Sequence, residues 1–216
     1  MRVLNNSIVG NEGIVEAIHD IIGWHYKRNL IHGSDDKNQF LKLVQESGEL
    51  ADNLLNHLSI KDDIGDMIVV LINLMERNNI SASECFTLSK RCAPQPRSST
   101  TCNSSLSRDI VDYLHFESRR TDFHEGISAS IYLDISADMG VLSDKICKGE
   151  ENLYIFIGNI FRRLVVLAEC HTLTIESCLQ QAWNDIKDRK GMMVDGVFVK
   201  EADFAAEPGS NYTNQN

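Results

Sequence analysis

Four carboxylates in the first third of the chain have the spacing of metal ligands. Glu46 and Glu49 form one pair, and Asp63 and Asp66 form a second. Residues three apart on a helix lie about 60° apart around its axis, so each pair would present two carboxylates on one face. Carboxylates without histidine or cysteine suit hard cations such as Mg²⁺ or Mn²⁺, which also coordinate substrate phosphates. The pattern therefore indicates phosphate chemistry that depends on Mg²⁺ or Mn²⁺.

The two pairs differ in how strongly they indicate a metal site, because their surroundings differ. Glu46 and Glu49 lie at the edge of a leucine stripe, and a solvated helix face would also explain them. Residues 64–75 are apolar around the whole helix, which is typical of a buried helix. An ionised Asp66 in such a helix needs a partner or a metal. For Asp63 a second interpretation is helix capping and favourable placement near the helix dipole.

The elements that must position these side chains are predicted to be helices. Apolar residues recur at spacings of three and four in seven segments, which are 14–31, 40–58, 64–86, 108–119, 125–147, 153–171 and 174–189. The segment GMMVDGVFVKE (191–201) has an Asp-Gly pair between short apolar runs, which predicts a small hairpin. We therefore expect an all-α helical bundle with a short C-terminal hairpin.

Parts of the first half recur in the second half. At an offset of 92, WHYKR (24–28) aligns with FESRR (116–120), and ESGELAD aligns with DMGVLSD. At an offset of 93, IGDMIVVLINL aligns with IGNIFRRLVVL, and ISASECF aligns with LTIESCL. Coincidence is the alternative, but four blocks in order favour a tandem duplication. The predicted organisation is repeat 1 (1–91), a Pro/Ser/Thr-rich linker (92–107), repeat 2 (108–205) and a disordered tail (206–216).

The second repeat lacks most of the acids. Val141 aligns with Glu49, Phe156 aligns with Asp63, and Asn159 aligns with Asp66. Folding of this helical unit therefore does not require those carboxylates. Their retention in repeat 1 favours a functional reason.

The composition indicates which classes of partner are unfavourable and where in the cell the protein is expected. The formal net charge is −10, which argues against a nucleic-acid polymer as the partner. No stretch approaches the length of a membrane span, and the N-terminal residues lack the pattern of a signal peptide. We expect a cytoplasmic protein with no membrane partner.

The acids and their flanking segments resemble the MazG-like all-α nucleoside triphosphate pyrophosphatases. That family carries an E-x-x-E pair followed by an E/D-x-x-D pair, here Glu46/Glu49 and Asp63/Asp66. Residues 24–52 resemble the N-terminal half of the family domain, especially in phage versions, and AWNDIKDRKGMMVDGVFVKE (182–201) resembles its closing segment. The resemblance implies hydrolysis of a nucleoside triphosphate to the monophosphate and pyrophosphate. It also implies Mg²⁺ on the four acids, with Glu49, or less favourably Glu46, as general base.

The resemblance also suggests residues that contact the substrate. Lys187, Arg189 and Lys190 match the basic end of the family motif, and Lys42 is a further candidate. A solvated basic helix end would explain the first three equally well. The two tryptophans, Trp24 and Trp183, could stack on a base, although aromatic residues at helical spacing are more often core.

Family members typically form dimers or tetramers whose sites lie at subunit interfaces. In a duplicated chain, the two repeats could form such an interface with each other. We therefore expect a pseudo-dimer in which repeat 1 supplies the acids and repeat 2 the basic segment, with further homo-oligomers left open. For a phage-encoded protein the location would be the host cytoplasm. Two alternatives remain: a dUTPase-like or other single-nucleotide pyrophosphatase, and a non-catalytic helical module that binds a nucleotide or a protein.

Overall fold

The computed structural model describes residues 6–80 and 127–204. The predicted linker (92–107), the predicted helix 108–119 and the predicted tail (206–216) lie outside these ranges. In order, the described elements are α1 (Asn6–Lys27), α2 (Asp36–Leu55), α3 (Lys61–Arg77), α6 (Ile127–Lys148), α7 (Tyr154–Cys170), α8 (Ile175–Ile186), β1 (Gly191–Val194), β2 (Val197–Lys200) and α9 (Glu201–Phe204). The prediction of a mainly helical fold is confirmed.

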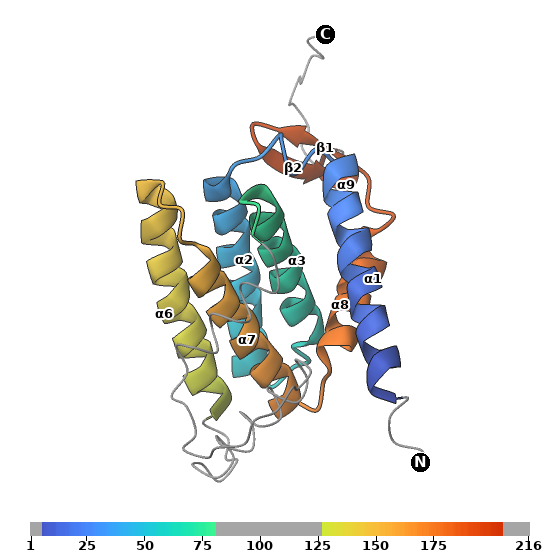
Figure 1. Ribbon diagram of the computed structural model, residues 1–216, viewed down its shortest axis with the longest axis vertical. Coiled ribbons are helices and arrows are strands. Elements are labelled where there is room, and N and C mark those ends of the chain that lie inside the picture. The colour runs from blue at the N-terminus through green and yellow to red at the C-terminus, as the bar shows by residue number, and fades with distance from the viewer. Residues whose placement is uncertain (1–5, 81–126, 205–216) are drawn as a thin grey trace.

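Two helical hairpins pack side by side (Figure 1). The first consists of α2 and α3, and the second of α6 and α7. Helix α2 contacts α6, and α3 contacts α7, so each hairpin contributes both of its helices to the interface. Helices α1 and α8 contact each other and cover the remaining side of α3. Helix α3 is therefore surrounded by other helices.

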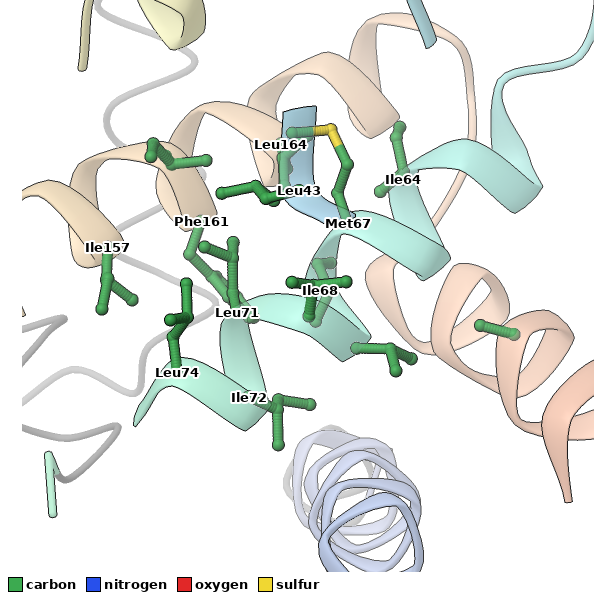
Figure 2. Packing of buried hydrophobic residues seen from close by; sticks show 14 of the residues in the cluster. Leu43, Ile64, Met67, Ile68, Leu71, Ile72, Leu74, Ile157, Phe161 and Leu164 are labelled. Carbon is green, nitrogen blue, oxygen red and sulfur yellow. The ribbon is translucent and has the colours of Figure 1, made fainter. Parts of the chain in front are cut away.

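The core is built around α3, as its apolar sequence predicts. Every residue from Met67 to Met75 is buried. Figure 2 shows Leu71 and Leu74 of α3 close to Phe161 of α7, with Leu43 of α2 nearby. The buried apolar side chains of both hairpins belong to one cluster. Because burial of apolar area is the main favourable term in folding, the two hairpins stabilise each other.

The two hairpins share details of their backbone. Helices α3 and α7 each contain 17 residues, and α7 begins 93 positions after α3. Both are followed by a residue with positive φ at matching positions, Asn79 (53°) and Thr172 (57°). The loops before them also match, with His57 at φ 55° and Gly149 at φ 68°. At the ends of α3 and α7 the residue after the left-handed one donates its N–H to a carbonyl five positions earlier: Ile80 donates to Met75, and Leu173 donates to Ala168. This is the 6→1 bond of a Schellman motif, which closes the helix.

Two local features complete the fold. Helix α3 ends at Arg77, although apolar spacing predicted a helix as far as residue 86, because Asn79 turns the backbone out of the helix. The predicted C-terminal hairpin is confirmed: Val194 pairs with Val197 across a two-residue turn. Asp195 (φ 49°) and Gly196 (φ 82°) both have the positive φ that a type I′ turn requires.

Candidate functional site

Helix α2 presents its two glutamates differently. Glu46 is only 4% exposed and forms an ion pair with Lys42, one turn earlier. Glu49 is exposed and accepts a hydrogen bond from Nε2 of Gln45 at 3.1 Å. The solvated-face interpretation is therefore wrong for Glu46, which is buried, and agrees with the exposure of Glu49.

Asp63 lies in the first turn of α3 and points at α2. It is 6% exposed, and both of its oxygens accept from Nδ2 of Asn53, at 2.8 and 3.1 Å. The N-cap residue of α3 is Ile60, which makes no side-chain capping bond. Asp63 is therefore not the N-cap residue, but its carboxylate lies in the first turn, where its own backbone N–H and the helix dipole both favour the ionised form.

Asp66 is half-buried one turn further along α3 and lies among other carboxylates. Burial, followed by the charges of Glu46 and Asp62, raises its pKa from 3.8 to about 7. The nearby charges of Arg189 and Lys42 act in the opposite direction but do not cancel this effect. The carboxylates of α2 and α3 thus repel one another across a short distance, which is the electrostatic situation that a bound cation relieves.

Three further polar residues belong to this group of side chains, and the sequence pattern gave no indication that Asp185 is one of them. Burial, a hydrogen bond to Asp185 and the charge of that residue raise the pKa of Asp62. Asp185 comes from α8, and no local pattern connects it with α3. Asn53 could have been found, because it lies one helical turn after Glu49 on the same side of α2. We call the set Glu46, Glu49, Asp62, Asp63, Asp66 and Asp185 the acid cluster.

The second half of the chain also supplies a cation to the acid cluster. Arg189 follows α8 and lowers the pKa of Asp66 through its charge. The backbone of Arg189 is fixed because Arg28 donates to its carbonyl from Nε (3.1 Å) and Nη2 (2.7 Å). Helix α8 approaches α3 closely at Gly65, where an added Cβ would lie 2.4 Å from the carbonyl oxygen of Cys178. This close approach brings the end of α8 to the acids.

The other predicted substrate residues lie elsewhere. Trp24, Trp183 and Lys187 line a cavity of about 310 Å³ between α1 and α8, and none of the acid cluster lines it. Trp183 and Asp185 are two positions apart on α8, which places them about 200° apart around its axis. Lys190 is exposed, and no described contact joins it to the acids. A role of these four residues in substrate binding stays a prediction.

Hairpin α6–α7 carries a different arrangement at the matching positions. Asp138, which matches Glu46, forms an ion pair with Arg163 and accepts from Nδ2 of Asn159 at 3.4 Å. Arg163 also lies 3.5 Å from a carboxylate oxygen of Asp134. The ammonium of Lys145 lies 5.7 Å from the centre of the Phe156 ring. The carboxylates of this hairpin therefore have a cation of the protein between them.

The acid cluster meets the chemical requirement for a divalent metal, but not as a finished coordination shell. Within residues 6–80 and 127–204, no three side chains of the types His, Cys, Asp and Glu already converge on one point. In the metal-free protein Glu46 pairs with Lys42, and Asp63 accepts from Asn53. The donor set consists of oxygens alone and carries excess negative charge, which fits Mg²⁺ or Mn²⁺.

Part of the chain is similar to a phage protein. Over 69 residues the chain is 38% identical to a protein of Haemophilus phage HP1 (strain HP1c1) named "Uncharacterized 18.2 kDa protein in rep-hol intergenic region". The match covers 31% of this chain and 42% of the phage protein, so it spans less than half of that relative. No protein-family model and no solved structure matches the chain. None of the described helices is long and apolar enough to cross a membrane.

Proposed function

We propose that the protein is a Mg²⁺- or Mn²⁺-dependent nucleoside triphosphate pyrophosphohydrolase, which converts a (d)NTP to the (d)NMP and pyrophosphate. The observation that carries the proposal is the acid cluster, in which burial and then the charges of Glu46 and Asp62 raise the pKa of Asp66 to about 7. A chain that maintains such repulsion gains from a divalent cation. The order of the acids, their resemblance to the MazG-like motif and the mainly helical fold support the same function.

The exposure of each acid suggests its role, either as a metal ligand or as the general base. Glu46, Asp63 and Asp66 are the more buried residues and would hold the metal together with Glu49. When bound, Mg²⁺ or Mn²⁺ polarises phosphate oxygens and neutralises the charge that develops in phosphoryl transfer. Glu49 is exposed and has one weak partner, Gln45, so its carboxylate is free to accept a proton from water.

The reaction itself is a hydrolysis at the α-phosphorus. The water oxygen forms a bond to this phosphorus, and the bond from phosphorus to the oxygen that bridges to the β-phosphate breaks. Pyrophosphate leaves with the bridging oxygen, and Glu49 receives the proton from water. Arg189 and Lys42, whose charges already reach Asp66, are the cations best placed to meet the triphosphate. Lys187, Lys190, Trp24 and Trp183 would have a role only if the substrate extends past α8.

The matched hairpins support a tandem duplication as the origin of this architecture. Helices α3 and α7 have the same length, the positive-φ residues coincide at offsets of 92 and 93, and both hairpins share one core. In this proposal the second copy completes the first as a pseudo-dimer, because α8 adds Asp185 and the following segment adds Arg189. One competent site per chain follows. Further association of the chain and a host-cytoplasm location belong to the same proposal.

The test is pyrophosphate release from a panel of dNTPs and NTPs with Mg²⁺ or Mn²⁺. We expect activity in the wild type and a loss of at least about 100-fold in Glu49→Gln, the usual scale for a general base. Glu151→Gln, an exposed acid in the loop before α7, is the matched control and should keep full activity. Activity toward one base alone would favour a single-nucleotide pyrophosphatase. Equal activity in Glu49→Gln, or no release from any nucleotide, would contradict the proposed site.

A further inference from the structure

A second candidate binding site lies on the side of α8 that faces α1. The cavity between these helices has a volume of about 310 Å³, near the lower end of the range of about 300–1,000 Å³ for small-molecule sites. Its lining combines two indole rings, of Trp24 and Trp183, with the cations Lys27, Arg28 and Lys187. Asp20 is the one carboxylate in the lining. Such a lining suits a ligand that is both aromatic and anionic.

Charge supports a ligand of this kind. The chain has a formal net charge of −10, yet three of the residues that line the cavity are cations. Arg28 is fixed by its bonds to the carbonyl of Arg189, and its guanidinium carbon lies 5.9 Å from the centre of the Trp24 ring. Lys187 donates only to the neutral side chain of Asn184, at 3.1 Å. Among the described residues, no carboxylate forms an ion pair with any of these three cations. Their charge is available to an anion.

Trp24 forms the packed wall of the cavity. Its side chain is 7% exposed, and the centre of its ring lies 5.7 Å from that of Phe198 and 5.6 Å from that of His25. Its Nε1 has no hydrogen-bond partner among the described residues and is covered by protein atoms, so a ligand in the cavity does not reach it. Trp183 is only partly buried and offers the more accessible indole.

We propose that the cavity between α1 and α8 binds a small aromatic anion of the nucleoside monophosphate class. The base packs against the partly buried indole of Trp183, beside the buried Trp24, and the phosphate lies between Lys27, Arg28 and Lys187. Base stacking on aromatic side chains and phosphate pairing with Lys or Arg are the two interactions that this lining offers. The site is separate from the acid cluster and needs no metal. It therefore stands whether or not the acid cluster hydrolyses nucleotides.

The two tryptophans make this proposal directly measurable. They are the only tryptophans of the chain, and both line the cavity, so intrinsic fluorescence reports on this place alone. The full chain is titrated in EDTA with each of the four common nucleoside monophosphates, and separately with adenosine and with inorganic phosphate. We expect a saturable fluorescence change with at least one monophosphate. Adenosine and phosphate alone should bind at least about tenfold more weakly, because each keeps only one of the two interactions.

Charge-neutral variants then locate the ligand. Lys27→Gln and Lys187→Gln change exposed side chains and should each weaken binding about tenfold, the scale of one lost charged contact. Lys37→Gln, an exposed lysine on α2 outside the cavity, is the matched control and should bind as the wild type does. Trp183→Phe leaves Trp24 as the reporter and should also weaken binding. Absence of any saturable change, or unaltered binding in both Lys27→Gln and Lys187→Gln, would overturn the proposal. So would binding that requires Mg²⁺ and is lost in Asp66→Asn, because the ligand would then lie at the acid cluster.

Discussion

The two helical hairpins treat their carboxylates in opposite ways. In α2–α3 the acids outnumber the cations near them, and the pKa of Asp66 is raised to about 7. In α6–α7, Arg163 lies between Asp134 and Asp138, and Asn159 donates to Asp138. The backbone of the two hairpins is nearly the same in helix length and turn conformation. The difference therefore lies in the side chains that one framework carries.

This comparison separates what the fold needs from what the proposed function needs. Hairpin α6–α7 packs into the shared core with Phe156 and Asn159 at the positions of Asp63 and Asp66, so the fold tolerates their replacement. In α6–α7 the side chain of Arg163 balances the charge of the carboxylates. In α2–α3 the charge of the carboxylates is only partly balanced. Incomplete balance is unfavourable for the metal-free fold and favourable for binding a divalent cation.

The largest expected effect comes from exchanging side chains between matching positions. Asp66→Asn should lower pyrophosphate release by at least about 100-fold, because it removes a proposed ligand and its charge. The reciprocal change, Asn159→Asp, should leave the rate unchanged. Steady-state assays on both variants with Mg²⁺ measure this difference. A similar loss of activity in both would show that the two hairpins are not divided in function.

The second effect concerns the approach of α8, which brings Asp185 and Arg189 to the acids. Gly65→Ala would place a Cβ 2.4 Å from the carbonyl oxygen of Cys178, and we expect destabilisation by about 3 kcal/mol from overpacking. Gly140 of α6 has nothing within 4 Å of its built Cβ. Gly140→Ala should therefore stabilise the protein by about 0.5–1 kcal/mol through helix propensity. Urea denaturation of both variants tests this, and equal effects would contradict the close packing of α8.

The third effect is a pH dependence of the metal-free protein. The pKa of Asp66 is 3.8 in the reference state and about 7 in the fold, so the folded state binds the extra proton between these values. Stability is then greatest below the unfolded pKa and falls as the pH rises through the folded pKa. Between about pH 5.5 and pH 8 in EDTA, we expect a loss of about 2 kcal/mol. Denaturation across this range should show a flatter profile for Asp66→Asn, and an equally steep profile would contradict the origin in Asp66.

The smallest effect should come from the cation of the other hairpin. Arg163→Met leaves Asp134 and Asp138 without their cation and should destabilise the protein by about 1 kcal/mol, since the pair is only partly buried. Adding Asp138→Asn should recover most of this loss, which a double-mutant cycle measures. Pyrophosphate release should stay at the wild-type level in both variants. Independent, additive effects of the two substitutions would mean that the ion pair contributes little.

The sequence was sufficient for the fold class and for the elements that position the acids. Apolar spacing predicted the described helices except the short α9, because burial patterns repeat with the helix period. The Asp-Gly pair predicted the hairpin because few residues adopt its turn. Helix ends were less predictable. Helix α3 stops at Arg77, since Asn79 adopts a positive φ that no apolar pattern indicates.

The candidate site was predictable only where its residues are close in the chain. Glu46, Glu49, Asp63 and Asp66 follow helical spacing, so their grouping could be foreseen. Asp185 could not, because its neighbour Asp62 is more than a hundred positions away and only the packing of α8 on α3 joins them. Spacing also did not show that Trp183 lines the cavity beside α1 whereas Asp185 lies near Asp62 of α3. That difference depends on which helices flank α8.

The bond from Arg28 to the carbonyl of Arg189 joins residues that are 161 positions apart. During synthesis, α2 and α3 leave the ribosome long before the segment that contains Arg189. A nascent chain can therefore form its early hairpin while the cation that faces Asp66 is still missing. Contacts with such a large sequence separation also form slowly, because a long loop must close before they contribute. The order of synthesis thus delays assembly of the acid cluster until nearly the whole chain has been made.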